Sequence, residues 1–118
     1  MNDNKLIAEF MGFKQPHPEY PDTTYWYKEL PNGRLETLAI LNYHISWDWL
    51  MPVVEKINLL DDYRYTVLIA SMDTQIVNNI TNDVIVEVSC KHSVDELIKS
   101  VYEAVVEFIK QLNNRNYE

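Results

Sequence analysis

A long amphipathic helix near the carboxyl-terminal end is the feature that most constrains the fold. Apolar residues recur there at intervals of three and four, the spacing of one helix face. They are Val94, Leu97, Ile98, Val101, Tyr102, Val105, Phe108, Ile109 and Leu112. Ser93 and Glu96 have the spacing of a capping box, and Asn113-Asn114 suits the helix end. Each such side chain contributes about 1.5–3 kcal/mol when fully buried, before entropy, so we predict that this helix packs on a β-sheet.

Four extended segments are predicted to form that sheet. Tyr25-Trp26-Tyr27 and the strand within 35–41 flank Asn32-Gly33. Asn-Gly between two such runs is the strongest short hairpin signal, because both central residues of the turn need positive φ. Residues 63–70 and 84–90 alternate in polarity, as strands do.

The two later strands differ in their second face. In 63–70 this face turns apolar at Leu68, which predicts a strand covered on both faces at that end. In 84–90 a single apolar face carries Val84, Val86, Val88 and Cys90. The polar segment 71–83 between them is predicted to be a mobile connection.

Two further helices are predicted upstream. Asn2, Asp3 and Asn4 offer caps for a short first helix whose apolar stripe is followed at once by Gly12, a typical stop. For the second helix two starts remain open. Either Ser46 is the cap, with Ile45 and Leu50 as a hydrophobic staple and Pro52 kinking the helix, or an irregular turn precedes a helix that begins near Leu50.

These elements predict one α+β domain over residues 1–118. The chain has 118 residues, which is long enough for one hydrophobic core of ordinary size and too short for two. Hydrophobic residues make up 47% of it, so such a core can form. The order is helix, two strands, helix, two strands, helix. We predict a largely antiparallel four-stranded sheet, since a tight turn joins only antiparallel strands, with three helices packed on it in a layered sandwich.

The charge of the chain restricts its partners. The formal net charge is −8, and no cluster of Lys or Arg occurs. Such a surface repels phosphate backbones and anionic membranes, so we predict neither nucleic-acid nor membrane binding. Three roles of this negative charge remain open: it keeps the protein soluble, it attracts a basic partner, or it mimics DNA. The longest carboxylate run, Asp61-Asp62, is short for a DNA mimic.

Cysteine usage and hydropathy indicate a cytoplasmic location. Cys90 is the single cysteine, so no internal disulfide can form, which suits a reducing compartment. The first residues lack the pattern of a signal peptide, and the longest aliphatic runs are far too short to span a bilayer.

Three stretches together resemble the phage ABA-sandwich domain, a family of small phage and prophage proteins of unassigned function. Residues 8–13, AEFMGF, are similar to its opening AEFMGW pattern, with Phe13 in place of the usual Trp. Residues 43–57, YHISWDWLMPVVEKI, are similar to its YHTSWDWLMPVVEKI segment, and residues 102–110 resemble its final helix. The resemblance implies helices on both sides of an antiparallel sheet and a phage or integrated-element origin. It implies no catalytic residues.

No constellation for catalysis or metal binding is evident. His17, His44 and His92 form no metal-ligand pair by spacing, and Cys90 with His92 supplies at most two ligands. A nucleophilic role for Cys90 would need a neighbouring base, and no Gly-x-Ser-x-Gly elbow occurs. We therefore expect no metal and no cofactor, and we favour binding over catalysis.

Aromatic residues, 12% of the chain, give the candidate binding site. Neighbours on a strand point to opposite faces, and residues two apart on a helix do not share a stripe. Some of these rings are therefore expected at the surface, against the plainer interpretation that all of them pack in the core. The candidate binding residues are Trp26, Tyr43, His44, Trp47 and Trp49.

These observations favour a small phage-type accessory protein that binds a protein partner or a second copy through an aromatic surface near Trp47 and Trp49. The alternative is a protein that sequesters a small, nucleotide-like ligand between aromatic rings. The first hypothesis predicts that Trp47 and Trp49 differ, one lying in the core and one at the surface.

Overall fold

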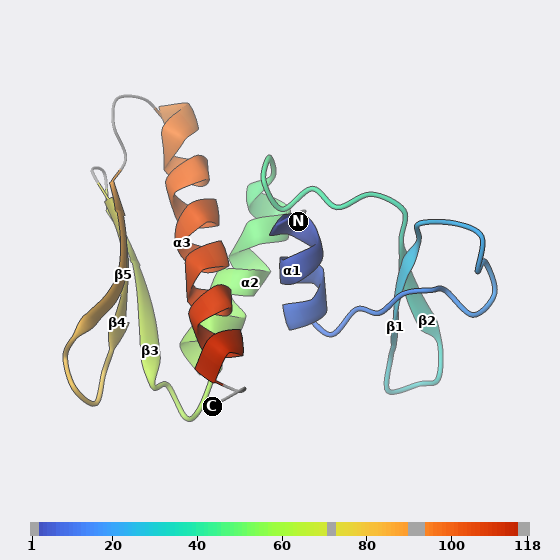
Figure 1. The fold of residues 1–118 in the computed structure, drawn as a ribbon, viewed down its shortest axis with the longest axis horizontal. Helices are drawn as coiled ribbons and strands as arrows, with labels where there is room; N and C mark the ends of the chain where they lie inside the picture. Colours follow the sequence, from blue (N-terminus) through green and yellow to red (C-terminus); the bar gives the residue numbers. More distant parts are fainter. Residues whose placement is uncertain (1–2, 71–72, 90–93, 116–118) are drawn as a thin grey trace. The chain divides into compact units, whose positions relative to one another are not determined.

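The described part of the chain folds into three helices and two antiparallel sheets. A computed structural model describes residues 3–70, 73–89 and 94–115, with the side chains of 94–96 outside the description. The elements follow in the order α1 (Asp3–Phe10), β1 (Trp26–Glu29), β2 (Leu35–Leu38), α2 (Trp47–Leu59), β3 (Tyr65–Ile69), β4 (Asp73–Asn78), β5 (Val84–Ser89) and α3 (Val94–Arg115) (Figure 1). None of these helices is long and apolar enough to cross a membrane.

The backbone divides into two compact units. The smaller unit is Met1–Asn42 and the larger unit is Tyr43–Glu118. The smaller unit holds α1, β1 and β2, and the larger unit holds the remaining elements. The single domain over 1–118 stays a prediction.

The α+β class is confirmed, but the single four-stranded sheet is wrong. Strands β1 and β2 form a two-stranded sheet, and β3, β4 and β5 form a three-stranded sheet in that order. The central strand β4 lies within the segment that we predicted as a mobile connection. Its buried face consists of Thr74, Ile76 and Asn78. Because two of these three residues are polar, the hydrophobic alternation that marks a strand is hidden.

In the smaller unit, Gly12 terminates α1 as predicted, two residues after the last helical residue, Phe10. Gly12 has a φ of +95°, and its N–H donates to the Glu9 carbonyl at 3.0 Å. The Phe13 N–H donates to the Ala8 carbonyl at 2.9 Å. This pair of bonds is the Schellman arrangement, in which a residue with positive φ lets the last carbonyls of a helix find donors.

The predicted hairpin forms, but with a different turn. Strands β1 and β2 pair from Trp26 with Leu38 to Glu29 with Leu35. Of the two central residues only Gly33 has positive φ, at +84°. The Asn32 side chain accepts a hydrogen bond from the Arg34 N–H at 3.0 Å. The five-residue connection from 30 to 34 thus needs left-handed backbone at its glycine alone.

A fully buried histidine organises the loop that leads to β1. The Glu19 N–H donates to Nδ1 of His17 at 3.1 Å, so the proton of the neutral ring lies on Nε2. Nε2 lies 3.0 Å from the Thr37 hydroxyl on β2 and can donate to it. Since both ring nitrogens serve the local structure, His17 is a structural residue.

We expect His17→Ala to destabilise the smaller unit by about 1–3 kcal/mol, because the Glu19 N–H loses its acceptor. His17→Asn is the matched control, since its Oδ1 can accept the same N–H in an Asx turn. Amide exchange measured by NMR checks this. The Glu19 amide should exchange faster than wild type in the Ala variant and remain protected in the Asn variant. Equal exchange in both variants would contradict the role of Nδ1.

In the larger unit, α2 and α3 pack on one face of the three-stranded sheet (Figure 1). The predicted stripe of α3 is buried at Val101, Val105, Phe108 and Ile109. The Phe108 ring meets the Tyr65 ring of β3 edge to face, with centroids 4.9 Å apart. The core of this unit is therefore the interface between α3 and the sheet.

Polar side chains also fasten the helices to the sheet. On α3, the Ser100 hydroxyl donates to the Val88 carbonyl of β5 at 3.0 Å and lies 3.0 Å from the Thr74 hydroxyl. The Gln111 amide donates to the Ile85 carbonyl at 3.1 Å. At the opposite edge of the sheet, the Asn58 side chain of α2 accepts the Val67 N–H of β3 at 2.8 Å. These bonds occupy backbone groups of the two edge strands, which discourages pairing with further strands.

Helix α2 begins at Trp47, which decides between the two starts that the sequence left open. Ser46 has the extended backbone of a cap, although its side chain makes no capping hydrogen bond. Pro52 lies within the helix. Ile45 remains 65% exposed, so it is not buried as a hydrophobic staple would be.

Two irregularities explain errors in the predicted strands. Asp61, Asp62 and Tyr63 all have positive φ, so Tyr63 lies in a left-handed turn before β3 and not in the strand. A register shift at Ile76/Val77 pairs Val77 with Val84, which places Val84 away from the core face that we predicted for it. The predicted capping by Ser93, and Cys90 on the same strand face, lie outside the described residues.

Candidate functional site

The five predicted site residues divide between the two units. Trp26 is in β1 of the smaller unit, and Tyr43, His44, Trp47 and Trp49 are in the larger unit, on α2 or just before it. The segment that precedes α2 brings the aromatic residues of the larger unit together, because the helix cap at Ser46 turns the chain between them.

Tyr43 and Trp49 form the inner part of this cluster. Their rings meet edge to face with centroids 5.2 Å apart, and Tyr43 is buried while Trp49 is half-buried. Tyr43 therefore packs in the interior and is not available to a partner. Trp49 packs against Tyr43, so its role is structural. Such a ring pair stabilises a fold by about 0.5–1.5 kcal/mol in addition to the stabilisation from burial of its apolar surface.

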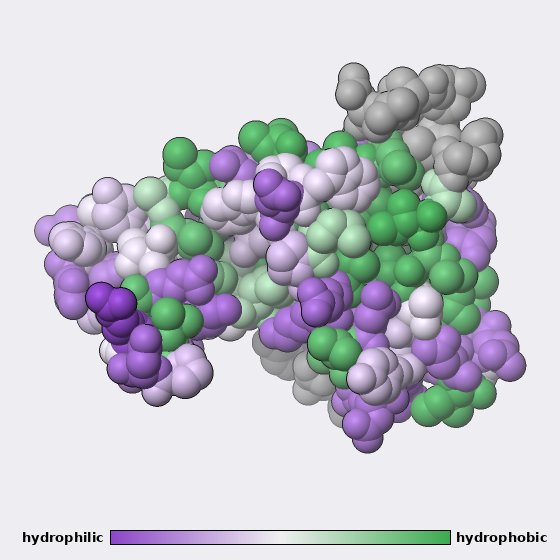
Figure 2. All heavy atoms as spheres, turned by 180° about the vertical axis from the view of Figure 1, so that it is seen from behind, coloured by the Kyte–Doolittle hydropathy of each residue, from purple (hydrophilic) through white to green (hydrophobic). Residues whose placement is uncertain are grey.

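Trp47 occupies the outer side of the same helix turn. It is 37% exposed, and Met51, one turn later on the same helix stripe, is exposed as well. Ile45 is exposed just before the cap. We call these three exposed apolar side chains, which lie within seven residues of one another in the sequence, the α2 patch: Ile45, Trp47 and Met51. Seen from behind, hydrophobic residues gather over the larger unit, whereas the smaller unit is more hydrophilic (Figure 2).

The α2 patch has polar neighbours. Asp48 and Glu55 on α2 are both exposed. His44 is exposed, and its ring lies 6.2 Å from that of Tyr102 on α3. An apolar centre within a polar rim is the usual composition of a protein-binding surface.

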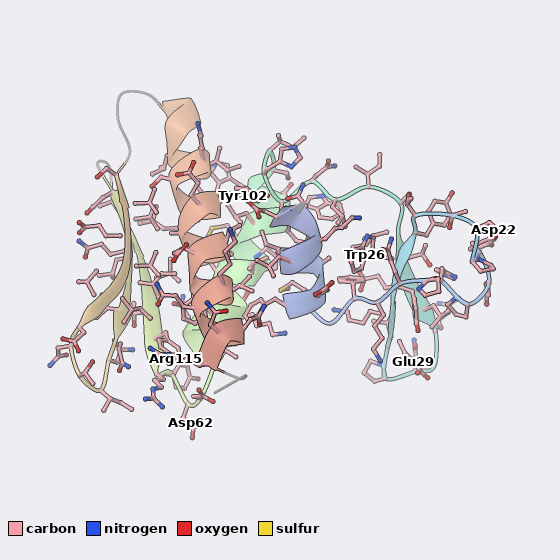
Figure 3. All side chains as sticks on the ribbon, viewed as in Figure 1. Asp22, Trp26, Glu29, Asp62, Tyr102 and Arg115 are labelled. Atoms are coloured by element: carbon pink, nitrogen blue, oxygen red, sulfur yellow. The ribbon has the colours of Figure 1, made fainter. Side chains whose placement is uncertain are left out.

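Trp26 has a different setting. It projects from β1 on the side of α1 and lines an open cleft of about 540 Å³ within the smaller unit (Figure 3). The other lining residues are Asn4, Lys5, Gln15, Pro16, Thr23, Thr24, Ala39 and Leu41. The Asn4 amide donates to the Leu41 carbonyl and the Gln15 amide donates to the Thr24 carbonyl. Both amides thus make hydrogen bonds between residues that line the cleft. Trp26 is only 5% exposed, so little of its ring is available for stacking.

The described residues hold no group of three or more His, Cys, Asp or Glu side chains that could bind a metal ion. The sequence pair Cys90 and His92 lies outside them.

Sequence reasoning missed Met51 as a surface residue and considered Ile45 only as part of a hydrophobic staple, in one of the two possible helix starts. The spacing contained a usable signal. Leu50, Val53, Val54 and Ile57 take the inner stripe and are buried. Met51 lies outside that stripe and faces outward, whereas Trp47, seven residues before Val54, lies at the edge of the stripe and is partly exposed.

Neither a family model, nor a curated protein, nor a solved structure matches this chain. The resemblance to the phage ABA-sandwich family therefore stays a prediction.

Proposed function

We propose that this chain is a phage-type accessory protein that acts by binding another protein through the α2 patch, without catalysis. One observation carries the proposal. Trp47, Met51 one turn later and Ile45 just before the helix are all exposed, while the neighbouring Trp49 packs on the buried Tyr43. A large apolar ring on a rigid helix turn loses little conformational entropy on binding, which is why Trp is enriched among the residues that dominate interface energies.

The charge of the chain favours a different protein over a second copy as the partner. Each chain carries a formal charge of −8, so two copies repel one another. Asp48 and Glu55 flank the α2 patch with further negative charge. A partner with an apolar pocket bordered by Lys or Arg would satisfy both parts of the surface, and the attraction would raise its association rate.

Small-ligand binding is the second candidate, and the cleft beside Trp26 supports it. Its volume, about 540 Å³, is within the range of about 300–1,000 Å³ that ligand pockets have. The burial of Trp26 opposes stacking of a nucleotide base on its ring, however, and Lys5 is the single basic residue among the lining residues. We therefore favour the protein partner.

We expect Trp47→Ala and Trp49→Ala to have different effects. Trp47→Ala should leave the free energy of unfolding within about 0.5 kcal/mol of wild type, because the ring is partly hydrated already. Trp49→Ala should lower it by about 2 kcal/mol, because a ring pair with the buried Tyr43 is lost. Urea unfolding followed by circular dichroism measures both values.

The binding test uses the same Trp47→Ala variant with Leu59→Ala as its control. Leu59 is an exposed apolar residue at the other end of α2. Each purified protein is immobilised, and captured host-lysate proteins are identified by mass spectrometry. We expect a basic protein that wild type and Leu59→Ala retain and that Trp47→Ala loses, with binding that weakens as salt is raised. Identical capture by all three proteins would refute the proposal, and so would a loss of stability in Trp47→Ala as large as that in Trp49→Ala.

A further inference from the structure

The three-stranded sheet has a second face, directed away from α2 and α3. We call it the outer face. Its residues are Thr66, Leu68, Asp73, Gln75, Val77, Val84, Glu87 and Ser89. None of these eight is buried. The opposite face, which α2 and α3 cover, carries Tyr65, Val67, Thr74, Ile76 and Val86, all buried.

Large apolar side chains lie on this exposed face. Leu68 is 48% exposed and Val84 is 49% exposed. Val77 pairs with Val84 on one side and with Thr66 on the other, and Leu68 pairs with Gln75, which is the next pair on this face. The sequence predicted that this end of β3 is covered on both faces, and the exposure of Leu68 shows that prediction to be wrong for the described chain.

The other half of the outer face is acidic and held in place. The Gln75 side chain donates from Nε2 to a carboxylate oxygen of Asp73 at 3.1 Å and to one of Glu87 at 2.6 Å. These bonds hold the two carboxylates on either side of one amide. Each carboxylate has further acceptor capacity, so a guanidinium or ammonium group can bind to it as well.

We propose that the outer face is a docking site for a basic amphipathic helix of a protein partner. The apolar stripe of that helix would cover Leu68, Val77 and Val84, and Lys or Arg on its flank would contact Asp73 and Glu87. Three strands about 4.8 Å apart make a face about 14 Å wide, which accommodates one helix about 10 Å across. The proposal concerns a different surface from the α2 patch and does not depend on it.

Charge argues against the other occupants. Two copies of this face would bring four fixed carboxylates into one interface between molecules that each carry −8, and the eight described residues of the face include no Lys or Arg to pair them. An anionic membrane surface is repelled for the same reason. A cationic helix, in contrast, pairs the carboxylates and covers the apolar half at once.

The test uses the full chain and a fluorescein-labelled synthetic helix of about 18 residues, with leucines along one stripe and lysines beside it. Binding is measured by fluorescence anisotropy. The critical variant is Leu68→Lys/Val84→Lys. Its matched control is Tyr63→Lys/Ile80→Lys, which makes the same charge change at two exposed residues outside the outer face. Unfolding of every variant is measured alongside.

We expect wild type to bind and the critical variant to bind at least about tenfold more weakly, since two lysines would have to be buried beside leucines. The control should stay within about threefold of wild type, because only screened charge has changed. Asp73→Asn/Glu87→Gln should weaken binding and reduce its salt dependence. A peptide with its leucines replaced by serine should not bind.

Four results would overturn the proposal. One is no binding by wild type. Another is equal weakening in the critical variant and its control, which would indicate charge attraction alone. A third is loss of binding in Trp47→Ala, which would place the peptide on the α2 patch. The last is a wild-type dimer in sedimentation that only the critical variant abolishes, which would make a second copy the occupant.

Discussion

Phe108→Ala is expected to lower the free energy of unfolding by about 3–5 kcal/mol. Phe108 is 2% exposed, and its ring meets that of Tyr65 at 4.9 Å. The truncation removes apolar contacts, leaves a cavity between α3 and the sheet, and loses the ring pair. Proteins of this size are stable by only about 5–15 kcal/mol, so the variant should be close to unfolding. Urea unfolding followed by circular dichroism measures the loss.

Two variants show whether the loss arises from packing at this site. Glu107→Ala changes the exposed neighbour on the same helix and should alter stability by less than about 0.5 kcal/mol. Tyr65→Phe keeps both rings and removes only the hydroxyl, 3.5 Å from a guanidinium nitrogen of Arg115, so it should cost less than about 1.5 kcal/mol. A Phe108→Ala protein as stable as the Glu107→Ala protein would show that α3 does not form the core.

The parts of the fold that the sequence predicts are those in which burial and hydrophobicity coincide. The stripe of α3 follows helix spacing for five turns, and Val101, Val105 and Phe108 are buried as expected. The stop at Gly12 depends on backbone conformation, which glycine identifies directly.

The parts that the sequence conceals are those in which polar groups are buried. On β4, Thr74 is fully buried because the Ser100 hydroxyl of α3, 26 residues away, lies 3.0 Å from its own. The Asn78 side chain accepts the Ile80 N–H at 2.9 Å, which supplies a local partner. Such partners are known only once the chain is folded, so a pattern based on hydrophobicity assigned β4 to a loop.

The candidate site was predictable only in outline. Spacing showed that Trp47 and Trp49 cannot share one helix stripe. In the structure Trp47 is exposed to solvent, whereas Trp49 is half-buried. Spacing did not show that Tyr43 would hold Trp49 while His44, the next residue, stays exposed. The outer face was hidden by the register shift beside Val77, because a single extra residue reverses the side of the sheet on which later side chains lie.

Pro52→Ala is expected to stabilise the protein, by about 1–2 kcal/mol. Proline has no N–H, so the Asp48 carbonyl one turn earlier lacks its helical donor, and the ring crowds that carbonyl. An interior proline destabilises a helix by about 3 kcal/mol relative to alanine. Part of the stabilisation gained on replacing it is lost again, because the unfolded chain has more conformational entropy with alanine than with proline. Pro52 is exposed, so no core packing is lost.

Urea unfolding of Pro52→Ala measures the gain, with Glu55→Ala as the control. Glu55 is exposed on the next turn of α2, and its replacement by alanine should change stability by less than about 0.5 kcal/mol. The Pro52 variant also separates stability from binding. Pro52 lies next to Met51 and five residues after Trp47, so a protein that becomes more stable but loses its partner would indicate that the proline sets the shape of the α2 patch. A fall in stability for Pro52→Ala would instead show that the ring packs in the folded protein and that α2 is not strained there.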